Sequence, residues 1–339
     1  MELPPVAGSL SQDAKDGLLR WFATEKRDLP WRHTSDPYAV WVSEIMLQQT
    51  QVVTVVPYFE RWLAKFPTVE ALACADEQTV LALWQGLGYY RRCRLLHQGA
   101  RYVIENGMPR SATEWRKVPG VGDYTAGAIS SISLNEPAPL VDGNVCRVYS
   151  RIGADRAVGS ALERNAWAWA RTHISLESPG DWNQALMELG ATICTPKQAH
   201  CHKCPLAPEC QANLRGLVSE LPTVKAKMAP MKLHHRTIIP RFENLFGVEQ
   251  IPEGEWWAGM WRFPKSRSEG AEVDAAYVGR FIHTVTNHRI SLEVYVREWK
   301  SCSSELRWME AQDLEEIAMP APQRRALALH LQAEPRLFG

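Results

Sequence analysis

The sequence contains no run of about 18 apolar residues, so we expect no transmembrane helix. Residues 1–10 contain no basic segment followed by an apolar stretch, which argues against a signal peptide. Net charge is absent as well, because 38 basic residues balance 38 acidic ones. Any nucleic-acid contact would therefore depend on local patches. The 339 residues, 45% hydrophobic and 22% charged, favour a cytoplasmic globular protein of two domains.

Cysteine is scarce except in one segment. Four of the eight cysteines fall within residues 194–210, with the spacing C-x6-C-x2-C-x5-C: Cys194, Cys201, Cys204 and Cys210. A secreted disulfide framework would be short and rich in cysteine throughout, and this chain is neither. Structural zinc sites usually have two close cysteine pairs, whereas only Cys201 and Cys204 form one here. The uneven spacing favours a [4Fe–4S] cluster and leaves zinc as the alternative.

The pattern of apolar residues predicts two domains of different class. Residues 13–213 are helical in pattern, with one helix expected over 69–83 and a break at Pro57. We predict a helical domain at 1–215, a basic linker at 216–233 and an α+β domain at 234–339. Alternating and β-branched runs predict strands at 236–239, 245–251, 280–286, 290–299 and 306–309, with a helix after Pro322.

Two glycines and two carboxylates in the helical domain are candidates for anion binding and for acid–base catalysis. Gly120 and Gly122 permit a tight hairpin whose backbone N–H groups could bind an anion, although an ordinary turn has the same sequence. Asp142 precedes a helix and should cap it, which favours the ionised carboxylate. Glu44 lies on a largely apolar helix face, where lost hydration should raise its pKa. One protonated and one ionised carboxyl can break a glycosidic bond, but either residue alone could be structural.

Together these motifs resemble the endonuclease III-type base-excision glycosylases. The stretches 41–50, 86–90, 141–145 and 256–264 resemble the MutY-type adenine DNA glycosylases in particular. The resemblance implies an all-α helix-hairpin-helix glycosylase domain with a [4Fe–4S] cluster loop, followed by an α+β Nudix-like domain that recognises 8-oxoguanine. It implies a base-excision-repair enzyme that acts as a monomer on double-stranded DNA with an adenine:8-oxoguanine or adenine:guanine mispair.

The resemblance also assigns roles to individual residues. Glu44 matches the general acid, and Asp142 matches the carboxylate that stabilises the oxocarbenium. Tyr124 and Asn144 match polar groups beside Asp142. Flipping the adenine out of the duplex would be assisted by residues that wedge into the stack. The remaining matches are to DNA and to the adenine pocket: Gln49, Thr50 and Tyr89 near the mispair, Gly120 and Gly122 on phosphate, and Arg27, Leu29, Trp31, Arg32 and Gln184 on the pocket wall.

Three departures refine this expectation. Bifunctional relatives carry a Schiff-base lysine where this chain has Tyr124, so we expect a monofunctional enzyme. The second domain lacks the glutamate-rich Nudix box, so pyrophosphatase activity is not expected. Where the family has a Phe-Ser-His turn, this chain has Thr286 and Asn287 followed by His288. Either His288 has moved into the role of the family's histidine, or Asn287 supplies the donors.

Two other functional classes are compatible with parts of the sequence. A non-catalytic iron–sulfur DNA-binding module would keep the hairpin and the cysteines without needing Glu44 opposite Asp142. An endonuclease III-like lyase acting on oxidised pyrimidines would need the missing lysine.

Overall fold

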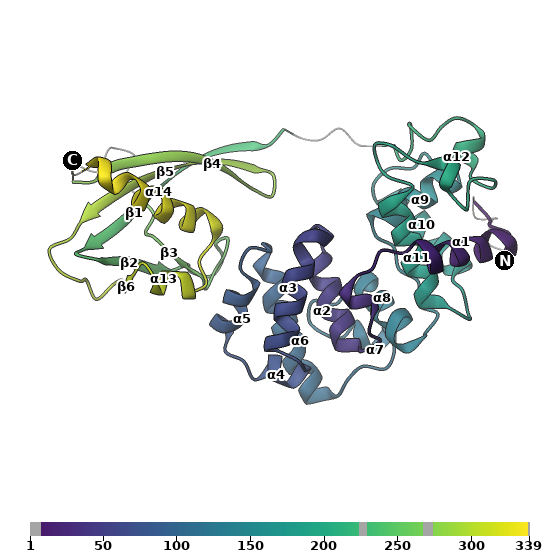
Figure 1. The fold of residues 1–339 in the computed structure, drawn as a ribbon, viewed down its shortest axis with the longest axis horizontal. Helices are drawn as coiled ribbons and strands as arrows, with labels where there is room; N and C mark the ends of the chain where they lie inside the picture. Colours follow the sequence, from purple (N-terminus) through teal and green to yellow (C-terminus); the bar gives the residue numbers. More distant parts are fainter. Residues whose placement is uncertain (1–7, 224–228, 267–273, 338–339) are drawn as a thin grey trace. The chain divides into compact units, whose positions relative to one another are not determined.

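The computed structural model describes residues 8–223, 229–266 and 274–337. By contacts between Cα atoms the chain divides into two compact units, which are described separately (Figure 1). One unit comprises residues 1–73 and 95–226, and the other comprises residues 74–94 and 227–339. The predicted boundaries at 215 and 234 stay a prediction, because this division assigns residues 74–94 to the second unit. None of the described helices is long and apolar enough to span a membrane.

The first unit is helical. Its core packs α2 against α8, and α11 against both α8 and α9. Five fully buried tryptophans, Trp41, Trp62, Trp115, Trp169 and Trp182, account for much of the high tryptophan content. The helices are α1 (Gln12–Glu25), η1 (Pro30–Arg32), α2 (Pro37–Leu47), α3 (Val52–Lys65), α4 (Val69–Ala73), α6 (Tyr90–Asn106, whose first residues belong to the second unit), α7 (Ala112–Trp115), α8 (Asp123–Leu134), α9 (Gly143–Ile152), α10 (Ser160–His173), α11 (Pro179–Thr192), η2 (Cys201–Lys203) and α12 (Gln211–Leu214).

Two expected helix boundaries are wrong. Pro57 lies inside α3, and the interruption falls earlier, at residues 48–51, where Gln49 adopts a positive φ of 57°. The helix expected over 69–83 is two helices, α4 and α5 (Glu77–Trp84). Asp76 separates them, because its side chain accepts the Thr79 N–H and so starts a new helix.

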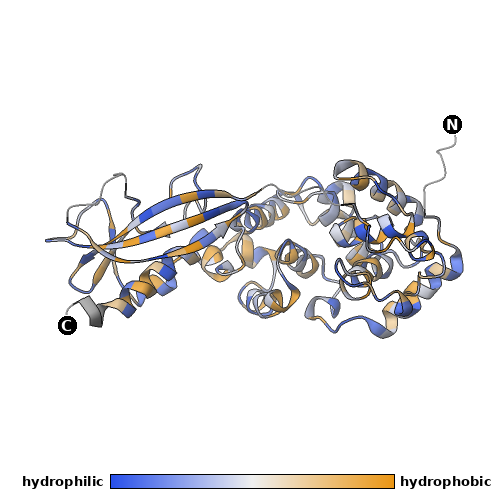
Figure 2. Cartoon of the chain, turned by 90° about the horizontal axis from the view of Figure 1, so that it is seen from above, coloured by the Kyte–Doolittle hydropathy of each residue, from blue (hydrophilic) through white to orange (hydrophobic). Residues whose placement is uncertain are grey.

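The second unit contains a mixed sheet with the strand order β3-β2-β1-β5-β4, and β6 pairs with β2. Strands β1 and β5 are parallel, and the other pairs are antiparallel. The alternation expected from the sequence is clear in β5, where Ile290, Leu292, Val294 and Val296 are buried, and Figure 2 shows orange and blue alternating along the long strands. The strands and helices are β1 (Met231–Phe242), β2 (Leu245–Gln250), β3 (Trp261–Arg262), β4 (Ala276–Val285), β5 (His288–Glu298), β6 (Arg307–Glu310), α13 (Asp313–Glu316) and α14 (Ala321–Leu337).

Strand β1 begins before the predicted linker ends. Met231–Leu233 were expected in the linker, but they pair with residues 288–290 of β5. Residues 224–228 of the linker lie outside the described residues. The predicted α+β class of the second domain is confirmed. Its first strand, β1, starts earlier than the local sequence pattern indicated.

Candidate active site

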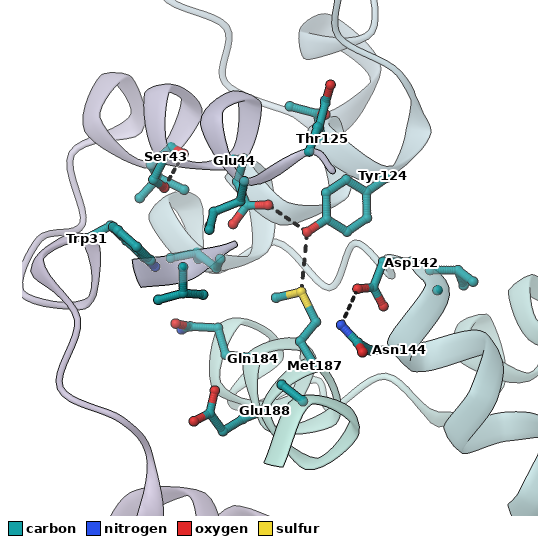
Figure 3. Close-up of a pocket in the computed structure, with 18 of the residues that line it drawn as sticks. Trp31, Ser43, Glu44, Tyr124, Thr125, Asp142, Asn144, Gln184, Met187 and Glu188 are labelled. Atoms are coloured by element: carbon teal, nitrogen blue, oxygen red, sulfur yellow. Dashed lines mark hydrogen bonds between the residues drawn. The ribbon is translucent and has the colours of Figure 1, made fainter. Parts of the chain in front are cut away.

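A cavity of about 860 Å³ opens in the first unit. Residues of η1, α2, α8, α9 and α11 line it, and Figure 3 shows Glu44, Tyr124, Asp142 and Asn144 facing this space from three different helices. The structure thus brings together side chains that are up to about 160 positions apart in sequence. The residues predicted from sequence that line the cavity are Arg27, Leu29, Trp31, Arg32, Glu44, Gln49, Thr50, Gly120, Gly122, Tyr124, Asp142, Asn144 and Gln184. Tyr89 belongs to the second unit, so its expected place beside Gln49 stays a prediction.

Glu44 is a buried carboxyl on α2, and its side chain reaches the cavity. Burial raises the pKa of Glu44 to about 7, although the hydroxyl of Tyr124 opposes this by donating to Oε2 at 2.6 Å. The nearby Asp142 also raises the pKa of Glu44. The raised pKa expected from the apolar helix face is confirmed. At neutral pH a substantial fraction of Glu44 carries a proton that it can give to a bound base.

Asp142 caps α9, as the sequence predicts. Its carboxylate accepts the backbone N–H of Val145 at 2.7 Å and the amide of Asn144 at 2.8 Å. Burial nevertheless raises the pKa of Asp142, because the cost of desolvation exceeds what these bonds and the charge of Arg147 return. The sequence indicated the hydrogen bonds, which lower the pKa of Asp142, but not the burial, which raises it.

The Gly120–Gly122 hairpin has the expected geometry. Gly120 has a φ of 81°, and a Cβ there would lie 2.6 Å from Leu95 Cβ, so only glycine fits. Gly122 is the capping residue before α8 and provides no side-chain cap, and nothing approaches within 4 Å of where its Cβ would be. The first N–H groups of α8 therefore have no side-chain acceptor from the capping residue. Phosphate binding at this hairpin remains a prediction.

Glu188 is a residue of the cavity wall that the sequence reasoning missed. Its carboxylate accepts Arg27 Nε at 2.7 Å and an Arg32 guanidinium N–H at 2.8 Å. Burial raises the pKa of Glu188, but the two arginines outweigh burial and lower it to about 2. Glu188 follows Gln184 by four positions, so helical spacing could have placed both on one face of α11. Its effect is to hold both guanidinium groups in fixed positions at the pocket wall.

Met187 was also missed. Its sulfur lies 3.3 Å from the Tyr124 hydroxyl, which donates to Glu44, and Figure 3 shows both contacts meeting at that hydroxyl. Nothing in the sequence distinguishes Met187 from the other apolar residues of α11, so its contact with Tyr124 could not be predicted.

The four clustered cysteines line one small cavity after α11, together with Arg151 of α9. Arg151 donates to Cys194 Sγ at 3.2 Å and to the Thr195 carbonyl at 2.9 Å. In the described residues, no three His, Cys, Asp or Glu side chains are arranged to hold a metal ion. The four thiols share one small cavity, and a [4Fe–4S] cluster there, with zinc as the alternative, stays a prediction.

Thr286 and Asn287 form the two-residue turn between β4 and β5, since Val285 pairs with His288. Thr286 has a φ of 52°, which is unusual for a β-branched residue. Its hydroxyl lies 3.3 Å from His288 Nδ1, and the Asn287 carbonyl accepts the Met231 N–H at 2.9 Å. The Asn287 side chain is exposed and His288 is half-buried. The turn thus offers Asn287, more than His288, to an incoming ligand.

Comparisons with known proteins support the fold class of the two units. Residues 42–171 match the family model of the HhH-GPD superfamily base excision DNA repair protein, and residues 237–329 match that of the NUDIX domain. An adenine DNA glycosylase of Arabidopsis thaliana is 37% identical over 332 residues, covering 85% of this chain and 51% of the relative. Another, from Buchnera aphidicola subsp. Acyrthosiphon pisum, is 34% identical and covers 74% of each chain. The structure of a thermostable thymine-DNA glycosylase has 28% identity and a TM-score of 0.53, covering 59% of this chain and 95% of that one.

The chain spans about half the length of the plant relative. With the Buchnera aphidicola relative the match extends over about three quarters of both proteins. The helix-hairpin-helix unit, the Nudix-like second unit and these relatives together show that the chain belongs to the adenine DNA glycosylase family.

Proposed function

We propose that this protein is a monofunctional adenine DNA glycosylase that hydrolyses the N-glycosidic bond of adenine opposite 8-oxoguanine or guanine. The observation that carries the proposal is the pair of carboxyls on one cavity, Glu44 with a pKa of about 7 and Asp142 at the cap of α9. The adenine must leave the duplex to reach this cavity.

Glu44 donates its proton to the imidazole nitrogen of the bound adenine, so that the base leaves neutral. Tyr124 fixes one carboxyl oxygen by donating to Oε2, which leaves Oε1 to carry and deliver the proton. Once deprotonated, Glu44 accepts a proton from the attacking water. General acid and base catalysis of this kind contributes about 10²- to 10⁴-fold each.

Asp142 stabilises the positive charge that develops on the sugar. Burial raises the pKa of Asp142, but a cation that forms beside the carboxylate favours the ionised form. Asn144 holds the carboxylate from one side, and Arg147 in turn donates to Asn144 Oδ1 at 2.7 Å. The carboxylate is therefore oriented before the bond breaks.

The enzyme leaves an abasic site because the cavity supplies no amine nucleophile. None of the described residues that line it is a lysine. In the resemblance to the bifunctional relatives, Tyr124 stands where they carry the Schiff-base lysine. An assay on a duplex with adenine opposite 8-oxoguanine tests this: strand breaks should appear only after hot alkali. Breaks without alkali would indicate a lyase, and no breaks at all would favour a non-catalytic DNA-binding module.

We further propose that Cys194, Cys201, Cys204 and Cys210 hold a [4Fe–4S] cluster. The common cavity that the four thiols line supports a shared metal group, and the uneven cysteine spacing favours iron–sulfur over zinc. The cluster would hold the loop together and present Lys197, His200, His202 and Lys203 toward a phosphate backbone. Thr286 and Asn287, with His288 as the alternative, would contact 8-oxoguanine.

A further inference from the structure

A strained turn between α5 and α6 presents Tyr89 to solvent. Three of its residues have positive φ angles: Gly86 at 102°, Gly88 at 71° and Tyr89 at 48°. Glycine adopts such angles freely, but a tyrosine does so at a cost in free energy, and residues of this kind cluster at functional sites. The Tyr89 side chain is 46% exposed, so burial offsets little of this cost. The contacts that keep the turn in this conformation must therefore come from neighbouring residues.

Arg92, in the first turn of α6, contacts both the backbone of this turn and the ring. Its guanidinium donates to the carbonyls of Leu87 and Gly88, each at 3.4 Å. The guanidinium carbon also lies over the Tyr89 ring, 5.2 Å from the ring centroid. In addition, the backbone N–H of Arg92 donates to the Tyr89 carbonyl at 2.8 Å. That last bond does not depend on the side chain, so substitutions at Arg92 can leave the start of α6 in place.

The same guanidinium contacts Trp84, the last residue of α5. Trp84 is fully buried, and the guanidinium carbon lies 5.6 Å from the centroid of its ring. The Trp84 indole N–H donates to the Gly88 carbonyl at 3.0 Å. Burial lowers the pKa of Arg92 to about 10, so the guanidinium remains charged at neutral pH. A partly desolvated cation interacts with an aromatic ring more strongly than a hydrated one, so Arg92 links the exposed Tyr89 ring to the fixed Trp84 ring.

We propose that Arg92 is a positioning residue, which holds the Tyr89 ring in its exposed orientation before DNA binds. This rests on the proposed function and on the expected role of Tyr89 as a residue that wedges into the base stack near the mispair. A wedge that is ordered in the free protein loses less conformational freedom on binding, so the pre-formed turn favours the extruded adenine. A direct phosphate contact is instead expected of an exposed arginine such as Arg91.

A double-mutant cycle on binding separates positioning from direct contact with DNA. One duplex has a non-hydrolysable adenine analogue opposite 8-oxoguanine, and the other is fully paired. On the mispaired duplex Tyr89→Ala should weaken binding about tenfold, the effect of one aromatic–base stack. Arg92→Ala should weaken it about fivefold, the effect of one cation–π contact. The double variant should bind as Tyr89→Ala does, because Arg92 acts through the ring, and binding to the paired duplex should stay unchanged in all three.

Two further variants sharpen the test. Arg92→Lys keeps the charge but not the planar group that donates to two carbonyls, so it should restore only part of the loss. The matched control is Arg91→Ala, which removes the exposed neighbouring arginine and should change binding to both duplexes by the same factor. Amide hydrogen exchange of the free protein over residues 85–91 should be faster in Arg92→Ala and unchanged in the control. Circular dichroism and thermal midpoints show whether each variant is folded.

Four results would overturn the proposal. Additive losses in the double variant would make Arg92 a direct DNA contact, and equal losses on both duplexes would make it a general one. No loss for either single variant would remove the wedge or its support, and unchanged exchange in Arg92→Ala would show that the turn is not held by Arg92.

The proposed function has a separate readout, the release of adenine by the wild-type protein, on which none of these binding measurements depends. A protein that releases no adenine but shows the coupled loss would refute the function and keep the positioning role of Arg92.

Discussion

Glu44 sets the pH dependence expected of the enzyme. Its carboxyl must be protonated to act as the acid, and burial raises its pKa to about 7. Base removal should therefore be fastest below pH 7 and decline as the pH rises through that value. Single-turnover rates on the adenine:8-oxoguanine duplex between pH 5.5 and 9 measure this. A rate that stays constant up to pH 9 would show that Glu44 is not the acid.

The same burial makes Glu44 costly for stability. In the unfolded chain Glu44 ionises near the ordinary glutamate pKa of 4.5, whereas in the folded protein it ionises near 7. The resulting loss of unfolding free energy is therefore absent below pH 4.5, grows as the pH rises and is complete above pH 7. Glu44→Gln should lower the single-turnover rate by about 10²-fold or more while duplex binding persists. It should also stabilise the protein at pH 8 by up to about 3 kcal/mol, and by less at pH 5.5.

Urea unfolding at the two pH values measures the stability of both proteins. A variant that lost activity and stability together at pH 8 would indicate a structural carboxyl.

The sequence could predict Glu44 because its neighbours on the helix face are apolar, a local property. It could not predict Tyr124 as its partner, because that contact joins two helices 80 positions apart.

Helix α9 gives Asp142 two separable tasks, capping and catalysis. Asparagine can still accept the Val145 N–H, whereas alanine cannot. Asp142→Asn should therefore abolish base removal with little change in stability. Asp142→Ala should also lose activity and in addition about 1 kcal/mol of unfolding free energy. Equal stability losses in the two variants would mean that the cap contributes little, and activity in either would refute the catalytic role.

The cysteine loop follows α11 and contacts α9 through Arg151, so the proposed cluster would stabilise a region built from both helices. We expect purified protein to be brown and to contain about four irons per chain. Cys201→Ser should mainly reduce folded yield and DNA affinity. One zinc and no iron per chain would contradict the assignment, and the surface substitution Cys74→Ser is the control because Cys74 is exposed and outside the loop.

The ends of helices and strands were predicted from the sequence only where a local signal sets them. A strong cap makes the start of a helix readable from the sequence, as at α7, where the Ser111 hydroxyl accepts the Glu114 N–H. Pro57 misled because a proline signals a helix break locally, while packing of Val55 and Phe59 in the core keeps α3 continuous. The start of β1 was missed because Met231 pairs with His288, a contact that no local pattern encodes.

At the scale of the whole molecule, the proposed function assigns each unit a different part of the recognition of one mispair. The adenine cavity belongs to the first unit, and the Thr286–Asn287 turn belongs to the second. A substitution at the turn should therefore change which duplex is chosen, and should change bond cleavage on a saturating substrate much less. Sequence resemblance located the turn, but only the structure shows that His288 already has partners in Thr286 and Trp256.

The double substitution Thr286→Ala with Asn287→Ala tests this division. 8-Oxoguanine differs from guanine by an acceptor oxygen at C8 and a donor N–H at N7. A hydroxyl and an amide can satisfy both. Losing them should lower the preference for 8-oxoguanine over guanine by about 1–3 kcal/mol, the value of a bidentate contact. Alanine at 286 also has to adopt the positive φ of Thr286, so the thermal midpoint of the variant must be checked.

Binding to the two duplexes is compared for this double variant and for His288→Ala. Since Asn287 is exposed while His288 is held by its neighbours, we expect the double variant to lose discrimination. His288→Ala should instead weaken binding to both duplexes alike, because it removes a ring that supports the turn through Trp256 and Thr286 but no exposed group that could read the edge of the base. Loss of discrimination in His288→Ala alone would assign the reading of 8-oxoguanine to His288 and would place the family's histidine one position later in this chain.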